Sequence, residues 1–372
     1  MHLALLLVSL VGAGSGSGPG RRPTAPPPPM TRTYYVAADT VRWNYVPGGI
    51  DQLSGRPYTD TAFFPDSAPR PVSTVYLKIL YREYTDATFQ TLKPRPPEWR
   101  HLGFLGPLLR AVVGDTIRVV FRNNAPGRFS MHPHGVFYEK SSEGAPYVDG
   151  TSGADTADDG VPQGGTHVYV WPVPARAGPG PNDGSSVLWM YHSHTDEVRD
   201  INSGLIGPII ITARAKARAD GTPVDVDREI VAAFAQVEEG SSWFADQNLP
   251  PFAKRAIPRS EPGRFDGYAF DVEFTINGFT HGSLPLEDLT IRKGQRVRWY
   301  VFGSTNDFDF HAPHWHGNTV LLNGMRTDVL QISMMQMVVA DMVPDNVGTW
   351  LFHCHVSFHF TDGMGVRYRV TE

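Results

Sequence analysis

The sequence predicts an all-β protein built from two β-sandwich or Greek-key barrel domains. Short runs of β-branched and aromatic residues are separated by turn residues, and the chain is rich in Gly and Pro, with 37 and 32 among 372 residues. No segment has the sustained 3.6-residue periodicity of a long helix. A set of motifs in the first half also recurs in the second half, which indicates two copies of one β domain.

The first thirty residues are expected to precede the folded part. Residues 3–11 form a short apolar run followed by small residues, which is typical of a secretory signal and too short to span a bilayer. A Gly/Pro-rich linker follows over residues 18–29. This segment predicts a secreted or periplasmic protein. No other stretch has the length and hydropathy of a transmembrane helix.

Strands are expected from residue 31 to the C-terminus. The runs at 75–81, 116–121 and 296–301 are rich in Val, Ile, Tyr, Trp and Phe. The polar stretch 216–227 is the predicted join between two domains. The predicted organisation is therefore a signal-like segment and linker at 1–30, a first domain at 31–216 and a second domain at 217–372.

The internal repeat has a clear signature. Residues 109–135 end in a His-x-His-Gly motif, and so do residues 289–317. In each half a Trp, Trp189 or Trp350, stands three residues before a second His-x-His pair. Two copies of one domain explain this order of motifs.

Composition excludes several classes of protein. A net charge of −5 argues against a nucleic-acid-binding protein, which needs a basic face. A single Cys cannot form an internal disulfide or a Cys-rich zinc site. The fourteen His are more informative, because ten of them fall into four tight clusters.

The spacing of these histidines suits metal binding. On a β-strand, residues i and i+2 point to the same side about 7 Å apart. Each His-x-His motif therefore presents two imidazoles on one face, and two motifs in each half suit a cluster of several metal ions shared between two domains. The four pairs are His132 and His134, His192 and His194, His314 and His316, and His353 and His355.

The last cluster adds a thiol. Cys354 lies between two cluster histidines and faces the opposite side of the predicted strand. With His311, His359 and Met364 it forms a His₂Cys set with a Met in position for a weak axial ligand, which is the blue-copper arrangement.

The first repeat lacks this second type of site. Ser193 stands where Cys354 stands in the second repeat, and Phe129 stands where His311 stands. One mononuclear site per chain is therefore predicted.

Together these motifs resemble those of the multicopper oxidase family. The order His-x-His-Gly, His-x-His, His-x-x-His-x-His and His-Cys-His-x₃-His-x₄-Met is complete. The framework stretches at 32–36, 105–111 and 203–208 are similar to the paired A-type domains of ceruloplasmin, hephaestin and the clotting cofactors. The likeness covers residues 33–372 and implies a cupredoxin-like fold for each domain.

The resemblance also implies four copper ions. It implies a blue copper on His311, Cys354 and His359 with Met364 as the axial ligand. It implies a trinuclear cluster whose mononuclear copper is held by His132 and His314, and whose copper pair is held by His134, His192, His194, His316, His353 and His355. The implied reaction is one-electron oxidation of a reductant coupled to reduction of dioxygen to water.

An acidic loop resembles the calcium loop of the same A-type domains. Hard oxygen ligands at short spacing suit Ca²⁺. The residues concerned are Lys140, Glu143, Asp149, Asp155, Asp158 and Asp159. The alternative is a solvated acidic loop without a metal ion.

Carboxylates are expected in two further roles. Dioxygen reduction consumes protons, so an acid is expected near the trinuclear cluster, with Asp309 and Asp196 as candidates. The reductant is either Fe²⁺ or a phenol or aromatic amine. Oxidation of Fe²⁺ requires carboxylates near the blue copper, and Asp307, Asp328 and Asp362 are candidates for that role.

Assembly and alternative functions complete the set of predictions. A cluster shared between domains suits a homotrimer in which three two-domain chains supply six domains around a ring. A copper nitrite reductase is one alternative, although that family carries its blue-copper Cys in the first domain. A non-catalytic copper- or calcium-binding scaffold resembling the clotting-cofactor A domains is the other.

Overall fold

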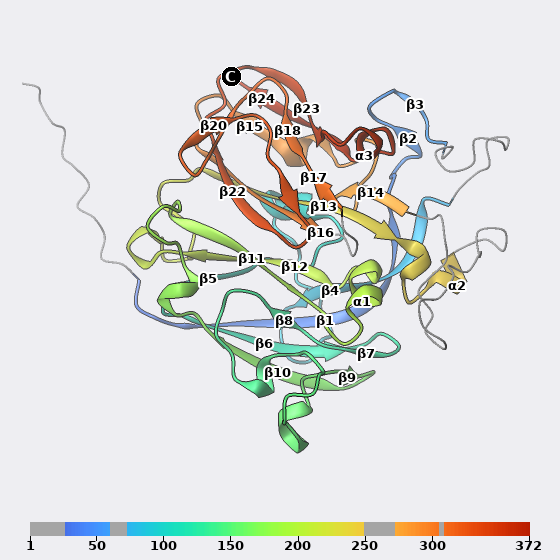
Figure 1. The fold of residues 1–372 in the computed structure, drawn as a ribbon, viewed down its shortest axis with the longest axis vertical. Coiled ribbons are helices and arrows are strands. Elements are labelled where there is room, and N and C mark those ends of the chain that lie inside the picture. Colours follow the sequence, from blue (N-terminus) through green and yellow to red (C-terminus); the bar gives the residue numbers. More distant parts are fainter. Residues whose placement is uncertain (1–26, 60–72, 249–271, 305–308) are drawn as a thin grey trace, which may run out of the picture.

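The computed structural model describes residues 27–59, 73–248, 272–304 and 309–372. Strands dominate it and the helices are short (Figure 1), which confirms the predicted all-β fold. The signal-like run at 3–11 and Asp307 lie outside the described residues. No helix in the described ranges is long and apolar enough to cross a bilayer.

The first half of the chain forms two four-stranded sheets. One has the order β10 (Thr166–Pro172), β6 (Thr116–Asn123), β1 (Thr31–Asn44) and β4 (Val75–Tyr84). The other has the order β5 (Leu109–Val112), β12 (Ile206–Thr212), β11 (Ser186–His192) and β8 (His132–Pro133). The pairs β1–β6 and β5–β12 are parallel, and the other pairs in these two sheets are antiparallel.

The second half repeats this topology. One sheet has the order β14 (Val272–Ile276), β13 (Arg228–Glu238), β16 (Val297–Ser304), β22 (Met337–Met342), β19 (Val320–Leu322) and β20 (Met325–Thr327). The other has the order β15 (Thr290–Arg292), β24 (Gly365–Thr371), β23 (Gly348–Cys354) and β18 (Pro313–Trp315). The parallel pairs β13–β16 and β15–β24 occupy the same positions as those of the first half. The repeat in the sequence is thus also a repeat in strand order.

Short elements connect and cover these sheets. Three two-stranded ladders pair β2 (Ile50–Asp51) with β3 (Arg56–Pro57), β7 (Arg128–Phe129) with β9 (Val161–Pro162), and β17 (Phe310–His311) with β21 (Ile332–Ser333). The α-helices are α1 (Glu197–Ser203), α2 (Ala245–Asn248) and α3 (Ser357–Thr361). The 3₁₀ turns are η1 (Pro97–Leu102), η2 (Lys140–Ser142), η3 (Gly153–Thr156), η4 (Ala175–Ala177), η5 (Arg214–Lys216), η6 (Glu239–Ser241) and η8 (Leu286–Leu289).

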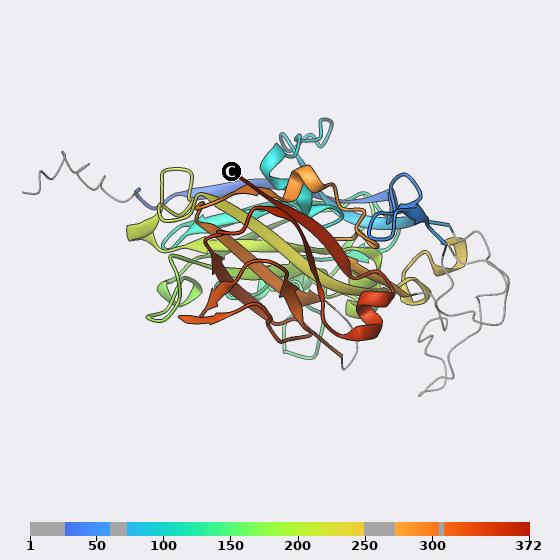
Figure 2. The same ribbon diagram turned by 90° about the horizontal axis from the view of Figure 1, so that it is seen from above.

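The two sandwiches pack against each other through a third apolar core (Figures 1 and 2). Consecutive residues of one strand pack into different cores. On β12, Ile209 and Ile211 face the first sandwich core, whereas Ile210 joins the core between the sandwiches. On β13, Phe234 faces the second sandwich core and Ala233 joins the core between them. Both faces of these strands are covered, which explains why β12 reads as a continuous apolar run.

Buried ion pairs also join the two halves. Lys78 on β4 donates to Glu239 Oε1 at 2.7 Å, and both side chains are fully buried. Tyr45 OH donates to the same oxygen at 2.6 Å. A second buried pair joins Arg110 to Glu229 at 2.8 Å. A buried charge requires its partner, so these pairs specify how the two sandwiches dock.

We predict that Glu239→Ala destabilises the protein by about 3–5 kcal/mol, because the Lys78 ammonium is then left buried without its counter-ion. The matched control is Asp227→Ala, which removes an exposed pair with Arg296 and costs less than about 1 kcal/mol. Urea unfolding of the full chain measures both values. Equal losses in the two variants would contradict the role assigned to Glu239.

Candidate metal centres

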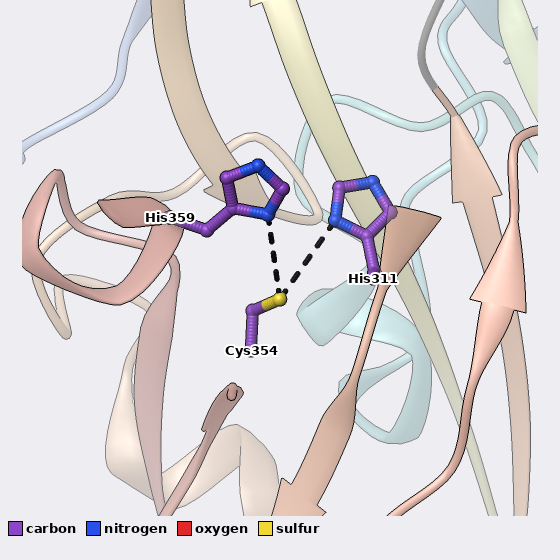
Figure 3. Close-up of side chains that lie close together, drawn as sticks. All are labelled: His311, Cys354 and His359. Atoms are coloured by element: carbon purple, nitrogen blue, oxygen red, sulfur yellow. Dashed lines mark hydrogen bonds between the residues drawn. The ribbon is translucent and has the colours of Figure 1, made fainter. Parts of the chain in front are cut away.

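Three buried side chains from the second half meet at one point (Figure 3). Cys354 is the last residue of β23, His311 is the last residue of β17 and His359 lies in α3. The Cys354 Sγ atom lies 3.4 Å from His359 Nδ1 and 4.0 Å from His311 Nδ1. The structure therefore brings together the three residues predicted to bind a mononuclear copper.

A carboxylate orients His359. Asp309 Oδ2 lies 2.8 Å from His359 Nε2, and a carboxylate only accepts hydrogen bonds, so Nε2 carries the proton and donates it. The lone pair of Nδ1 is then left facing Cys354 Sγ, as a metal ligand requires. Gln236 Nε2 also donates to Asp309 Oδ2 at 2.8 Å.

The charge of Asp309 is stabilised locally. Burial acts to raise the pKa of this carboxyl, but hydrogen bonds from the Phe310 N–H, Gln236 and His359 outweigh burial and hold the pKa below its usual value. The carboxylate is therefore ionised at neutral pH and keeps His359 in one tautomer.

Backbone hydrogen bonds tie Met364 to the same point. The Met364 N–H donates to the His359 carbonyl at 2.8 Å, and the Cys354 N–H donates to the Met364 carbonyl at 3.0 Å. The Met364 side chain is fully buried. The Ala312 N–H donates to Cys354 Sγ at 3.3 Å, while burial raises the pKa of the thiol.

This donor set fits copper. The Cys354 sulfur faces the unprotonated Nδ1 of His359, and His311 Nδ1 lies beside it. The thioether side chain of Met364 is also buried. Soft sulfur ligands combined with imidazoles select copper. A bound metal ion also keeps such a thiol deprotonated, which burial alone opposes.

The eight histidines of the four His-x-His pairs form two groups with the same internal geometry. In the first group, His134 Nε2 lies 3.1 Å from His192 Nε2. In the second group, His316 Nε2 lies 3.1 Å from His353 Nε2. The first group contains His132, His134, His192 and His194, and the second contains His314, His316, His353 and His355.

Backbone carbonyl groups set the tautomers of four of these rings. Each accepts a hydrogen bond from Nδ1, which leaves Nε2 without a proton and able to bind a metal ion. The four bonds join His132 to Glu143 at 2.7 Å, His192 to Ser193 at 3.1 Å, His314 to Asp328 at 3.0 Å and His353 to Cys354 at 2.7 Å. The equivalent rings of the two groups are thus oriented in the same way.

The Gly of each His-x-His-Gly motif has a packing role. Gly135 has φ +76° and a Cβ atom there would lie 2.2 Å from the Trp189 ring. Gly317 has φ +72° and a Cβ atom there would lie 2.4 Å from the Trp350 ring. The Trp that precedes the second His pair therefore packs on the backbone that follows the first, which explains why both features recur together.

The two groups do not meet within one chain. In the part of the chain that the structure describes, no histidine ring of one group contacts a histidine ring of the other. Each group is open to solvent: His316 and His355 are exposed, and His132 and His134 line a surface cavity of about 410 Å³. One chain therefore presents two separate groups of four histidines.

We predict that the copper-free protein loses stability as the pH falls from about 7 to 4. Burial lowers the pKa of His311 to about 3, with the charge of His359 adding to the effect. Burial likewise lowers the pKa of His134 and of His353 to about 4. A histidine in the unfolded chain has a pKa of about 6.5, so below this pH the unfolded chain binds more protons than the folded chain. Each such histidine therefore lowers the free energy of unfolding by up to about 1.4 kcal/mol per pH unit.

Urea midpoints at several pH values measure this loss. His311→Gln is expected to reduce the slope with which stability falls toward acid pH, because the variant lacks the histidine whose pKa burial lowers to about 3. The same slope of stability against acid pH in wild type and in His311→Gln would contradict the lowered pKa assigned to His311.

The first half has no equivalent of the cysteine site among its described residues. Phe129 and Ser193 occupy the corresponding positions and both are buried. Ser193 Oγ donates to Asp200 Oδ2 at 2.6 Å, and the Trp243 indole donates to Asp200 Oδ1 at 2.8 Å. Apolar packing and hydrogen bonds fill the place that the second half uses for Cys354.

The expectation for Asp309 needs correction. It was expected beside the clustered histidine pairs, but its carboxylate contacts His359 at the cysteine site. Asp196 caps α1 by accepting a hydrogen bond from the Arg199 N–H at 3.3 Å. The carboxylate beside the first group is Glu197, whose Oε2 lies 3.7 Å from His194 Nε2.

Of the three carboxylates considered for iron binding, Asp328 and Asp362 lie in the described residues. The Asp328 carbonyl contacts His314 of the second group. Asp362 caps the C-terminus of α3.

The acidic loop forms two adjoining clusters. Lys140 Nζ contacts Glu143 Oε2 at 2.6 Å and Asp149 Oδ2 at 2.8 Å, and it also contacts the Tyr147 hydroxyl. Asp158 is buried: its Oδ2 accepts from the Gly144 N–H at 2.7 Å, and its Oδ1 has no partner.

The remaining two predicted residues of the loop differ in environment. Burial and the neighbouring Asp158, Asp149 and Glu143 raise the pKa of Asp159 to about 6. Asp155 lies exposed on η3.

Sequence reasoning missed Gln236 and Glu197. Gln236 lies on β13, more than seventy residues before Asp309, and no local motif marks it. Glu197 follows His194 at i+3 where α1 begins, and this spacing is a signal that could have identified it.

Comparisons with known proteins agree with this geometry. Two family models described as "Multicopper oxidase" match residues 101–216 and 269–372. The chain is 40% identical to Ferroxidase HEPHL1 of Mus musculus over 92% of its own length and 29% of that protein. It is 39% identical to Hephaestin of Homo sapiens over 91% and 29%, and 35% identical to Ceruloplasmin of Homo sapiens over 92% and 32%. The chain thus spans about a third or less of these relatives.

Solved structures share the fold. The Blue Copper Oxidase from Nitrosomonas europaea has a TM-score of 0.58 and 17% identity, covering 91% of this chain and 86% of that chain. The Multicopper Oxidase mgLAC has a TM-score of 0.57 and 18% identity, covering 92% and 86%.

Proposed function

Since this chain belongs to the multicopper oxidase family, we propose that it oxidises a reductant by one-electron steps at a mononuclear copper and reduces dioxygen to water at a trinuclear copper centre. Four electrons and four protons convert one dioxygen to two waters. The observation that carries the proposal is the convergence of His311, Cys354 and His359 in the same chain as two matching four-histidine groups. Copper bound at these residues supplies the electron-transfer and dioxygen chemistry.

The residues of β23 connect the two kinds of site. Cys354 faces the mononuclear site, while its sequence neighbours His353 and His355 belong to the second four-histidine group. One residue of backbone thus separates the thiol from either imidazole. This short covalent path supports transfer of electrons from the site of entry to the site of dioxygen reduction.

We infer that the reductant is an aromatic molecule, such as a phenol or aromatic amine, that approaches His359. Phe274 packs on the His359 ring at 5.0 Å, and Phe358 packs on it at 4.3 Å with 51% of its surface exposed. The Asp309 carboxylate contacts the mononuclear site through His359. An aromatic ring can lie on Phe358 while its OH or NH₂ group donates to Asp309.

Oxidation of Fe²⁺ is the second candidate function. The matched proteins that carry the name ferroxidase favour it. A hard cation needs several oxygen ligands, and the described surroundings of His359 offer one carboxylate next to two phenylalanines. The geometry therefore favours the organic reductant.

Dioxygen uptake by the copper-loaded protein distinguishes these reductants. We expect faster uptake with 2,6-dimethoxyphenol than with Fe²⁺, after correction for spontaneous iron oxidation. Faster uptake with Fe²⁺ would overturn the aromatic assignment. No uptake with either reductant would overturn the oxidase proposal.

Asp309→Asn is expected to slow phenol oxidation by about 10–100-fold, because the carboxylate orients His359 and increases its basicity. The same change is expected to raise the reduction potential of the mononuclear copper, since a less basic ligand stabilises the oxidised metal less. Redox titration of the blue absorption measures this shift. Asp328→Asn, near the second four-histidine group, is the control and is expected to leave the potential unchanged.

We propose that the trinuclear centre forms between neighbouring chains of a homotrimer. The two four-histidine groups of one chain do not touch each other, and each is open to solvent. A heterologous contact that joins the first group of one chain to the second group of the next closes into a ring of three. A monomeric mass with full copper occupancy would contradict this assembly.

We further propose export from the cytoplasm and a Ca²⁺ ion at the acidic loop. The signal-like run at residues 3–11 supports export. The buried Asp158 Oδ1, which lacks a hydrogen-bond partner, supports a cation next to Asp159. The nitrite-reductase and scaffold alternatives account less well for two complete four-histidine groups.

A further inference from the structure

A cleft of about 790 Å³ lies on the first sandwich, apart from the histidine sites. Strands β1 and β4 form one wall, and residues 92–110, which include η1, form the other. No residue that lines the cleft belongs to the cysteine site or to either four-histidine group. Its function is therefore separate from the proposed electron entry at His359.

The lining of the cleft is strongly basic. Four of its cationic side chains have carboxylate partners: Lys93 with Glu83 at 2.8 Å, Arg100 with Asp288 at 2.9 Å, Arg110 with Glu229 at 2.8 Å and Arg82 with Asp39 at 4.0 Å. Arg42 and Arg95 also line the cleft, and neither has a carboxylate partner among the described residues. Glu83 attracts Arg95 electrostatically, but its carboxylate is paired with Lys93, so in the described ranges neither Arg42 nor Arg95 has a carboxylate of its own.

Arg95 is held in a fixed orientation. Its Nη1 donates to the Gly103 carbonyl at 2.8 Å and its Nη2 donates to the Leu105 carbonyl at 2.7 Å. Burial lowers the pKa of Arg95, yet a guanidinium group stays charged at neutral pH. A partly buried cation without a counter-ion is stabilised when an anion binds beside it.

Two half-buried tryptophans add a flat apolar surface. The Trp99 ring lies under the Arg110 guanidinium at 5.7 Å and packs on His101 at 5.5 Å. The Trp43 indole donates to the Gly278 carbonyl at 2.6 Å, which fixes its ring. Rigid aromatic side chains of this kind bind planar rings.

We propose that this cleft binds an aromatic anion, of the aromatic carboxylate or sulfonate class. Its ring lies on Trp43 and Trp99 and its anionic group lies at Arg95, while Arg42 adds positive charge at the rim of the cleft. The net charge of −5 on the whole chain makes this local excess of positive charge selective, since the rest of the surface repels anions.

Isothermal titration calorimetry with 2-naphthoate on the copper-loaded full chain tests the proposal. One molecule is expected to bind per chain, and the neutral analogue 2-naphthalenemethanol is expected to bind at least about tenfold more weakly, because it cannot pair with a guanidinium group. Equal affinity for the two compounds would overturn the proposal. The measurement does not depend on turnover, so a failed oxidase assay leaves it interpretable.

Charge reversal at the rim of the cleft locates the site. Arg42 is exposed and makes no hydrogen bond or ion pair through its side chain within the described ranges, so Arg42→Glu is expected to fold normally and to weaken 2-naphthoate binding by about tenfold or more. Arg56→Glu is the matched control, since Arg56 is also exposed in the first half and lies outside the cleft. Equal weakening by both variants, or no weakening by Arg42→Glu, would overturn the assignment.

Discussion

Cys354→Ser is expected to abolish the blue absorption and to reduce dioxygen uptake to the uncatalysed background. The serine hydroxyl is a hard, weakly acidic ligand and cannot replace a thiolate that faces the imidazole of His359 at 3.4 Å. The electron path along β23 is lost with it. Absorption spectroscopy and an oxygen electrode measure both effects.

The internal repeat offers a matched control. Ser193 occupies the position of Cys354 in the first half and contacts Asp200 rather than a metal site. Ser193→Ala is expected to cost about 1 kcal/mol of stability and to leave the blue absorption intact. Retention of the blue band in Cys354→Ser would contradict the assignment of the mononuclear site.

Variants that lack one or the other four-histidine group are expected to be inactive alone and to complement each other when mixed. His132→Ala/His134→Ala removes half of the first group, and His314→Ala/His316→Ala removes half of the second. In an equal mixture, each group is intact in half of the chains. In a trimer with shared centres, both groups are therefore intact at about a quarter of the interfaces. Activity is expected to recover to about that fraction.

The mixing experiment requires subunit exchange, so the two variants are denatured together and refolded with copper. Each variant refolded by itself is the control. Failure of the mixture to exceed both controls, with wild type recovering under the same conditions, would contradict a centre shared between chains.

The histidine and cysteine motifs could be predicted because they depend on local strand geometry. Residues i and i+2 of one strand share a face, so His314 and His316, or His353 and His355, converge whatever the rest of the chain does. The order of motifs also predicted the repeat of strand topology. Short-range periodicity carries this information without any tertiary contact.

Features that depend on distant segments could not be predicted. Asp309 was expected near the clustered histidines because of its place in the sequence, but its carboxylate contacts His359. Gln236, on β13, reaches the same carboxylate only after the sheets have packed. The buried pair of Lys78 and Glu239 likewise joins residues 161 positions apart. No periodicity in the sequence encodes such pairings.

Copper content and copper spectroscopy of the purified, assembled protein test the central claim most directly. The account predicts four copper ions per chain by elemental analysis: one blue copper, one further mononuclear copper visible by electron paramagnetic resonance, and a coupled pair that is silent in that measurement. Two copper ions per chain, or fewer, in protein that is fully assembled and saturated with copper would contradict it.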